Sequence, residues 1–359
     1  MGFVHTHSDP EIYVHFHGQD IIILVIYVDD SLFIGFNKSY LKFKKKQFMD
    51  HWESRDLGEA TEYLGMQITQ DCAKCTLKWD QIWYAAKVIE HFKLNNAKVA
   101  HTPLPSGYNP GPNPKTTTPQ LCSHYQSVIG SLLYIMLGTC PDIAFSVITM
   151  SQFSSNPSEE CLQKALYIVQ YLLGMKELCI TYDGASGSGF VAYSDTDWGG
   201  DLETHRSTLG YVMFLGNGIV SWLLRQQCNI TLFSTEAEYV GMTEASKQIS
   251  WIWNLLSEMR FSIKSILLLV DNQGAMFLAS NPAQEGCTKH IEIPEHYIHK
   301  CIQKEKVKLF YIPTNEQRAD VFTKNLTWQC FEENRKSLSL STYTLWIARW
   351  SVGNWHSNI

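Results

Sequence analysis

Four acidic residues, each placed where an apolar segment ends or a helix begins, constrain the fold of this chain more than any other feature. Asp195 ends the alternating segment GFVAYSD, and Glu238 lies in the helix start STEAEY. Asp271 ends the apolar segment ILLLV, and Asp320 lies near the start of a short helix in NEQRADVF. The four acids are separated by 43, 33 and 49 residues. Together they can hold a pair of divalent metal ions for phosphodiester hydrolysis.

Glu238 has a second interpretation, which the residues alone leave open. Thr235 and Glu238 are spaced as in a capping box, where the glutamate serves only the helix start. Glu238 is also in line with Met242, Ala245 and Ile249 at helical spacing. A carboxylate in line with an apolar stripe is costly to bury unless a cation pairs with it. A metal ion would supply that cation.

The other three acids also have structural alternatives. Asp195 can simply end a strand at a turn, and Asp197 is a nearby alternative candidate for the metal ligand. Asp271 can cap the helix that follows it, and Asp320 within a helix is unremarkable by itself. Each alternative is plausible for one residue, but four acids in this order favour a metal site.

The order of these segments resembles ribonuclease H, and their amino-acid sequences are similar to the ribonuclease H of copia-type LTR retrotransposons. The shared motifs are YSDTDWGGD, RSTLGYV, STEAEY, DNQGA, TKHI and PTNEQRADVFTKNL, in the family's order. The resemblance implies an α/β fold over residues 186–328, with a mixed five-stranded sheet and flanking helices. The whole chain resembles the C-terminal part of a copia-type Pol polyprotein.

The resemblance also implies a chemistry for these acids. Asp195, Glu238, Asp271 and Asp320 are expected to be catalytic ligands of two Mg²⁺ ions, for which Mn²⁺ can substitute. The expected substrate is the RNA strand of an RNA–DNA hybrid, which is recognised by its 2′-hydroxyl groups and groove shape. No small-molecule cofactor is expected.

The N-terminal residues 1–36 are expected to form strands that carry two acids at a hairpin tip. Asp29 and Asp30 lie between two apolar runs in DIIILVIYVDDSLFIGF, which follows EIYVHFHG. Two aspartates in a tight turn usually serve only to stabilise the turn. YVDD also resembles the metal-binding signature in the palm of a reverse transcriptase. The family's third aspartate precedes this segment, so we expect an incomplete polymerase site without polymerase activity.

Further residues are expected to contact a template–primer duplex or hybrid. Lys42, Lys45 and Lys46 share one side of a predicted helix over Tyr40–Trp52, where they form a solvated face or contact phosphates. EYLGMQI resembles the family's primer-positioning segment. The other expected contacts are Leu64, Gly65, Arg206, Lys289 and His290.

Shifts in composition divide the chain into five segments. Residues 1–100 resemble a truncated palm and thumb, and residues 101–120 contain six prolines, which predicts a linker. Residues 121–185 show apolar spacings of three and four, which predicts an all-helical connection. Residues 186–328 form the predicted nuclease, and residues 329–359 form a C-terminal tail. From Ser341 onward this tail extends past the position where sequences of the family usually end.

Composition is compatible with these expectations. Hydrophobic content of 45% and charged content of 18% are typical of a globular protein. The net charge of −6 argues against a purely electrostatic nucleic-acid binder, but the predicted metal ligands account for much of the acidity. The ten cysteines form no framework, and the N-terminus has no secretory pattern. The longest apolar run, Ile21–Val28, is too short to span a bilayer. We therefore expect an intracellular protein that is neither secreted nor membrane-bound.

Several positions depart from the family pattern. Cysteine or histidine replaces the family's arginine at Cys140, His205, Cys287 and His299, and Phe233 replaces a serine. Cysteine and histidine cannot replace the two parallel hydrogen bonds of a guanidinium group. The alternative to an active nuclease is therefore a catalytically dead, decayed remnant that at most binds nucleic acid.

Overall fold

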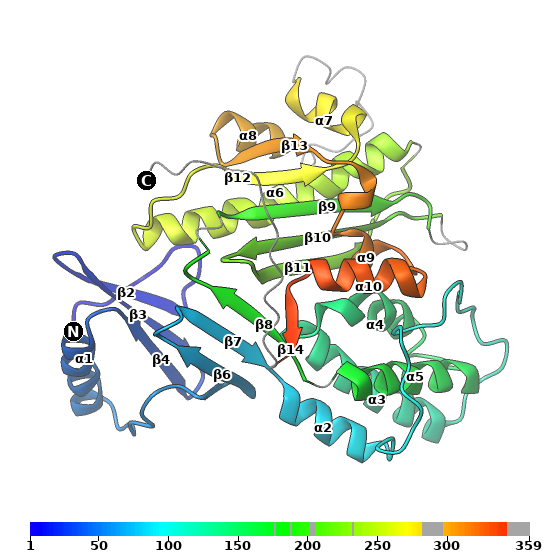
Figure 1. Ribbon diagram of the computed structural model, residues 1–359, viewed down its shortest axis with the longest axis horizontal. Helices are drawn as coiled ribbons and strands as arrows, with labels where there is room; N and C mark the ends of the chain where they lie inside the picture. The colour runs from blue at the N-terminus through cyan, green and yellow to red at the C-terminus, as the bar shows by residue number, and fades with distance from the viewer. Residues whose placement is uncertain (176, 187–188, 201–204, 232, 282–296, 343–359) are drawn as a thin grey trace.

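The computed structural model describes residues 1–175, 177–186, 189–200, 205–231, 233–281 and 297–342. Its strands form three sheets, and a block of helices fills the space beside two of them (Figure 1). No helix among the described residues is both long enough and apolar enough to cross a membrane.

The N-terminal sheet has the strand order β1-β2-β3-β4, and all of its strands are antiparallel. Tyr27 pairs with Asp30, so Val28 and Asp29 alone form the turn of the predicted hairpin, which is confirmed. Val28 has a φ of +52°, a conformation that is strained for a β-branched residue. The elements are β1 (Val4–His5), β2 (Ile12–His17), β3 (Asp20–Tyr27), β4 (Asp30–Gly35) and α1 (Lys38–His51).

The middle sheet corrects one prediction. Leu178–Asp183, which we expected to lie in an all-helical segment, forms strand β8 and pairs with β7. The segment is rich in residues that favour strands, and β7 offers it an antiparallel partner from about 100 residues earlier in the chain. The sheet order is β14-β8-β7-β6-β5. Its other strands are β5 (Glu62–Tyr63), β6 (Met66–Asp71), β7 (Thr76–Asp80) and β14 (Leu340–Thr342).

The helical block has one apolar core, which also includes one face of the third sheet. Tyr125, Leu132, Ile168 and Tyr171 are fully buried in it, as expected from apolar residues at spacings of three and four. Phe331 and Leu338, at the start of the predicted tail, join the same core. The helices are α2 (Ile82–His91), α3 (Pro119–Gly138), η1 (Pro141–Ile143), α4 (Ala144–Ser151), α5 (Glu159–Met175) and α10 (Trp328–Ser337).

The proline-rich segment before α3 contains no helix or strand but is attached to the core. Leu104 is fully buried. The Asn325 side-chain amide donates hydrogen bonds to the carbonyl oxygens of Pro105 and Tyr108, each at 3.1 Å. Helix α3 begins at Pro119, inside the predicted linker, where the Thr118 hydroxyl accepts a hydrogen bond from the Leu121 amide.

The third sheet has the order β11-β10-β9-β12-β13, with β9, β10 and β11 antiparallel and β12 parallel to both β9 and β13. It is the predicted mixed five-stranded sheet, and the α/β fold class is confirmed. Along β10, Tyr211 and Met213 pack under α6, while Val212 and Phe214 pack against the helical block. The elements are β9 (Val191–Asp197), β10 (Thr208–Leu215), β11 (Gly218–Gln226), α6 (Ser234–Glu258), β12 (Ile266–Val270), α7 (Gln273–Ser280), α8 (Tyr297–Gln303), β13 (Val307–Tyr311), η4 (Thr314–Glu316) and α9 (Asp320–Thr323).

The N-terminal sheet is attached to the far end of α6 (Figure 1). Glu258, the last residue of α6, accepts hydrogen bonds from the His7 amide at 2.5 Å and from the Ser8 hydroxyl at 2.6 Å. The Trp251 indole donates a hydrogen bond to the Ser8 carbonyl oxygen at 2.8 Å. Below these contacts, Val14 and Ile21 pack against Leu255 and Met259.

Replacing Glu258 by glutamine is expected to loosen the N-terminal sheet without affecting the nuclease sheet. Glu258 lies near the surface, where such charged contacts contribute about 0.2–1 kcal/mol, so local opening should become up to about fivefold more frequent. Hydrogen exchange over residues 4–17 measures the change. Glu244→Gln, on the same helix but paired with Arg225 and Lys247, is the control. Equal exchange in both variants would contradict this role of Glu258.

Candidate active site

Three of the four predicted acids meet at one end of the third sheet. Asp195, Glu238 and Asp271 each offer a carboxylate oxygen, and these oxygens all lie within 4.8 Å of one another. Asp195 and Glu238 are buried, with exposed fractions of 1% and 8%. Asp195 comes from β9, Glu238 from the second turn of α6, and Asp271 from the residue after β12. We call these three residues the carboxylate cluster.

Close packing of α6 against β9 places Glu238 in the cluster. At Gly241 a Cβ atom would lie 2.5 Å from the Thr196 hydroxyl oxygen, so only glycine lets the helix come this close. The Thr196 hydroxyl and the Gln227 side-chain amide both donate hydrogen bonds to the Ala237 carbonyl oxygen. The backbone next to Glu238 is therefore held from two sides.

The capping alternatives for Glu238 and Asp271 are wrong. The residue before α6 is Phe233, and no side-chain hydrogen bond caps that helix. Helix α7 is capped by Asn272, whose side-chain oxygen accepts a hydrogen bond from the Ala275 amide at 3.0 Å. Neither acid is needed to start its helix.

Asp320 lies beside the cluster but is not one of its three members. It begins α9, which packs over β10 at Gly210, the residue paired with Asp195. A Cβ atom at Gly210 would lie 2.8 Å from the Phe322 Cβ atom, so a side chain there would push α9 away. This approach lets the Thr323 hydroxyl donate a hydrogen bond to Asp195.

Lys324 joins Asp320 to the cluster, and we did not predict it. Its Nζ atom lies 2.6 Å from Asp320 Oδ1 and 3.3 Å from Asp195 Oδ2. Its position four residues after Asp320, the spacing of helical ion pairs, was a usable signal in the sequence. Asp197 is half-buried near this group, but it is not a member of the cluster.

The cluster fits a hard divalent cation. Burial, followed by the charges of Asp195 and Asp271, raises the pKa of Glu238 to about 9. Burial and then Asp195 raise the pKa of Asp320 to about 6. One oxygen of Glu238 and one of Asp271 are shielded from water and have no hydrogen-bond partner. An all-oxygen donor set with unsatisfied carboxylates and mutual repulsion is what Mg²⁺ or Mn²⁺ would stabilise.

These shifts predict that the metal-free protein loses stability as pH rises. The folded state holds its proton on Glu238 above the ordinary pKa of 4.5, so the free energy of unfolding falls from about that pH up to about pH 9. Thermal melts in a chelator should therefore shift to lower temperature between about pH 6 and about pH 9. Mn²⁺ should raise the melting temperature more at the higher pH, because it binds the deprotonated cluster.

The matched control for this pH dependence is Glu238→Gln, which cannot titrate and should flatten the metal-free profile. A metal-free melting temperature that stays constant over this range would contradict the account. An equal Mn²⁺ effect at both ends of the range would contradict it as well.

Known proteins are similar to this chain both in its N-terminal part and along most of its length. The family of the reverse transcriptase (RNA-dependent DNA polymerase) matches residues 1–106. The retrovirus-related Pol polyprotein from transposon TNT 1-94 of Nicotiana tabacum is 33% identical over 336 residues, which cover 92% of this chain and 25% of that protein. The corresponding Pol polyprotein from transposon RE1 of Arabidopsis thaliana is 31% identical, over 92% of this chain and 22% of that protein.

This chain belongs to the Pol polyproteins of copia-type retrotransposons. It spans about a quarter of the length of the Pol polyproteins that it matches. Two solved structures are also similar, at 17% and 12% sequence identity. The first is RNase H1 from Halobacterium salinarum, where the match covers 38% of this chain and 95% of that chain with a TM-score of 0.26. The second is the N-terminal RNase H domain of Rv2228c from Mycobacterium tuberculosis, where the match covers 42% of this chain and 97% of that chain with a TM-score of 0.28. These TM-scores are too low to add to the strand order described above.

In this Pol chain the acids predicted for the polymerase site stay apart from the carboxylate cluster. Asp29 and Asp30 are exposed at the β3–β4 turn. Among the described residues, no third metal-binding side chain completes a cluster with them. At 1.5 Å per residue, Glu238 lies about 30 Å along α6 from the end of that helix that contacts the N-terminal sheet.

The residues predicted to contact nucleic acid are spread over several surfaces of the Pol chain. Lys42 and Lys46 are exposed on α1, while Lys45 is partly covered and pairs with Asp56. Leu64 and Gly65 form the turn between β5 and β6. Arg206 is exposed before β10. Lys289 and His290 lie outside the described residues.

The departures from the family's arginines fall in different environments. Cys140 is buried, His299 is buried on α8, and His205 is exposed with a φ of +54°. Phe233 is exposed just before α6. Cys287 lies outside the described residues. Cys140 sits beside two buried carboxylates, Asp80 and Asp142, whose charges both act on its thiol.

Proposed function

We propose that this chain hydrolyses the RNA strand of RNA–DNA hybrids at the carboxylate cluster. The observation that carries the proposal is the cluster itself: three carboxylate oxygens within 4.8 Å, two of the acids with an unsatisfied buried oxygen. Membership of the Pol family supports the nucleic-acid substrate. The order of the third sheet supports the ribonuclease H assignment of residues 186–328.

The chain's own residues have distinct parts in this proposal. Two divalent ions, when bound, would supply activation of water and neutralisation of charge on the leaving 3′ oxygen. Asp195, Glu238 and Asp271 are the residues that would hold the metal. Asp320, which Lys324 now neutralises, would add a further carboxylate. Thr323 fixes the orientation of the Asp195 carboxylate by its hydrogen bond.

The experiment is a cleavage assay on one sequence in three forms, an RNA–DNA hybrid, a DNA duplex and an RNA duplex, with Mg²⁺ or Mn²⁺. We expect cleavage of the RNA strand in the hybrid alone, and none in a chelator. Cleavage of the DNA duplex at a similar rate would contradict the substrate class. Failure to cut any of the three at saturating metal would favour the decayed remnant, which only binds nucleic acid.

By itself, the 359-residue chain should not extend a primer. Two-metal polymerisation needs several carboxylates on the same ions, and Asp29 and Asp30 have no third partner among the described residues. Primer extension on a homopolymer template should stay at background. Extension that disappears in the Asp29→Asn variant would show that this expectation is wrong.

A further inference from the structure

Helix α9 brings three polar residues to the carboxylate cluster from one side. It begins with Asp320, and its last turn places the Thr323 hydroxyl and the Lys324 ammonium group against Asp195. The helix is only four residues long, and a helix of one turn has almost no stability of its own. The contacts that hold its two ends therefore determine the geometry on this side of the candidate active site.

The first end of α9 is held by the nuclease sheet. The Gln317 side chain has an exposed fraction of 2%, and its amide nitrogen donates a hydrogen bond to the Ser194 carbonyl oxygen at 2.9 Å. Its amide oxygen accepts a hydrogen bond from the Ala319 backbone amide at 3.2 Å. Ser194 precedes Asp195 on β9, so this end is attached to the strand that carries the cluster.

The second end of α9 is held by a segment from outside residues 186–328. Asn325 follows Lys324, and its side-chain amide donates hydrogen bonds to the carbonyl oxygens of Pro105 and Tyr108, each at 3.1 Å. These partners precede Asn325 by 220 and 217 residues. The two bonds match the two hydrogens of a primary amide, which asparagine has and aspartate lacks.

The outer segment, residues 101–118, is itself fixed to the helical block, and we call it the strap. Leu104 is 1% exposed and belongs to the core of that block. The Lys164 ammonium group, on α5, lies 4.9 Å from the centroid of the Tyr108 ring. The carbonyl groups that accept from Asn325 are therefore held on a rigid base, which makes the strap an anchor for α9.

We propose that Asn325 is a positioning residue, through which the strap sets the place of Asp320 and Lys324 at the metal site. Phe322 is fully buried between β10 and the helical block, so α9 can tilt about this contact when one end is released. Because Lys324 pairs with both Asp320 and Asp195, such a tilt changes both contacts together. The inference rests on the proposed function in that Asp320 takes part in holding the metal.

The test compares Mn²⁺ binding by wild type and Asn325→Ala, measured by calorimetry without nucleic acid. Residues that orient metal ligands change metal affinity by about 10- to 100-fold, so the variant should bind Mn²⁺ about tenfold more weakly. In the metal-free protein, the backbone amides of Phe322 and Lys324, which are hydrogen-bonded within α9, should exchange about tenfold faster. Unchanged Mn²⁺ affinity in Asn325→Ala would overturn the proposal, whatever the exchange rates.

Two further variants separate positioning from a general loss of structure. Asn325→Leu keeps the bulk of the side chain but donates no hydrogen bond, so it should bind Mn²⁺ as weakly as Asn325→Ala. Asn113→Ala is the matched control, because the Asn113 amide holds the strap to the Pro157 carbonyl oxygen at 2.9 Å and does not contact α9. It should keep wild-type Mn²⁺ affinity. Equal weakening in Asn113→Ala and Asn325→Ala would show a general effect of the strap and contradict the role of Asn325.

Cleavage distinguishes this inference from the hydrolytic function on which it rests. Asn325→Ala should need about tenfold more Mn²⁺ for half its maximal rate, with an unchanged KM for the hybrid. If the wild type binds Mn²⁺ but cleaves nothing, the hydrolytic function fails, and the affinity comparison still decides the role of Asn325. A wild-type protein that binds no Mn²⁺ would overturn both.

Discussion

Replacing Asp271 by asparagine should reduce hybrid cleavage by at least about 100-fold while leaving the fold intact. Loss even of a group that only supports a metal ligand costs about 10- to 100-fold in activity or affinity, and Asp271 is placed to bind directly. Its side chain is only partly buried and caps no helix, so the core does not depend on it. The measurement is the single-turnover cleavage rate at saturating Mn²⁺, with a thermal melt as the test of folding.

The metal-free melt makes this prediction sharper. Asp271 raises the pKa of Glu238 by its negative charge, so Asp271→Asn should leave the metal-free melting temperature unchanged or higher. It should also reduce the rise that Mn²⁺ produces. Asp197→Asn is the matched control, since Asp197 lies near the cluster without belonging to it, and should lose less than about tenfold. Cleavage by Asp271→Asn at the wild-type rate would rule out the assigned site.

Replacing Cys140 by arginine should raise the melting temperature by about 2–6 °C. Burial, followed by the charge of Asp142, raises the pKa of the Cys140 thiol. One Asp142 oxygen accepts a hydrogen bond from the Tyr171 hydroxyl at 2.5 Å, while the other is shielded from water and has no hydrogen-bond partner, although the charge of Arg335 also acts on this carboxylate. Leaving a buried group unsatisfied costs about 1–3 kcal/mol, and each kcal/mol is worth about 2 °C in a chain of this size.

The controls separate charge from size at this position. Cys140→Met adds length without charge and should not stabilise the protein. Combining Cys140→Arg with Asp142→Asn should remove the gain if the guanidinium pairs with that carboxylate. Restoring arginine at His205 and Cys287 as well should add less, because His205 is exposed. If the Cys140→Arg protein is no more stable and cleaves no faster, the substitution is neutral, and the decayed-remnant interpretation loses its main support.

Local patterns predicted the parts of this fold that local chemistry determines. The β3–β4 hairpin follows from two apolar runs around Asp29, and the acids fall at element ends because alternation and helix starts are visible in the sequence. The pattern could not predict β8, whose partner β7 lies about 100 residues away. Strand pairing at that distance depends on tertiary packing rather than on local preference.

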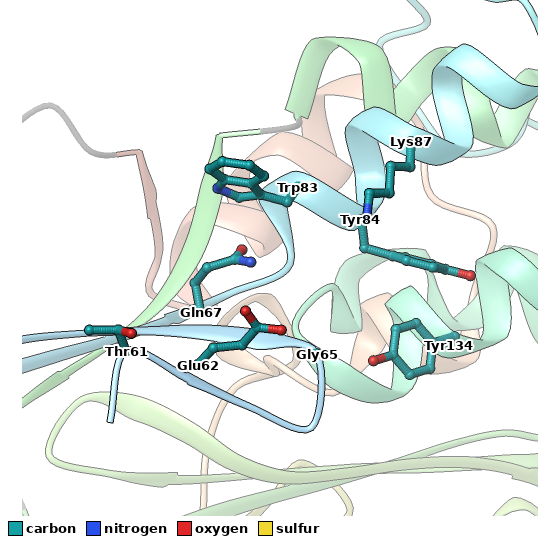
Figure 2. Close-up of a pocket in the computed structure, with 8 residues that line it drawn as sticks. All are labelled: Thr61, Glu62, Gly65, Gln67, Trp83, Tyr84, Lys87 and Tyr134. Carbon is teal, nitrogen blue, oxygen red and sulfur yellow. The ribbon is translucent and has the colours of Figure 1, made fainter. Parts of the chain in front are cut away.

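At the candidate site, too, local sequence patterns did not predict which distant segments pack together. The sequence indicated the four acids, but not that α9 would pack over Gly210 and bring Lys324 onto Asp195. The groove lined by Gln67, Trp83 and Tyr134 (Figure 2) was also not predicted, because these three residues come from three different elements. Only Leu64 and Gly65 of that region were expected, and they were expected from a resemblance. Juxtaposition of segments is what the structure adds.

The most direct test of the account is to locate metal in the site by anomalous scattering from a crystal soaked in Mn²⁺. The account predicts a peak in contact with the carboxylate oxygens of Asp195, Glu238 and Asp271, with Lys324 displaced from Asp195 where the second ion binds. The Asp271→Asn crystal should show a weaker peak or none. Saturating Mn²⁺ with no peak at these three acids in the wild-type crystal would contradict the account.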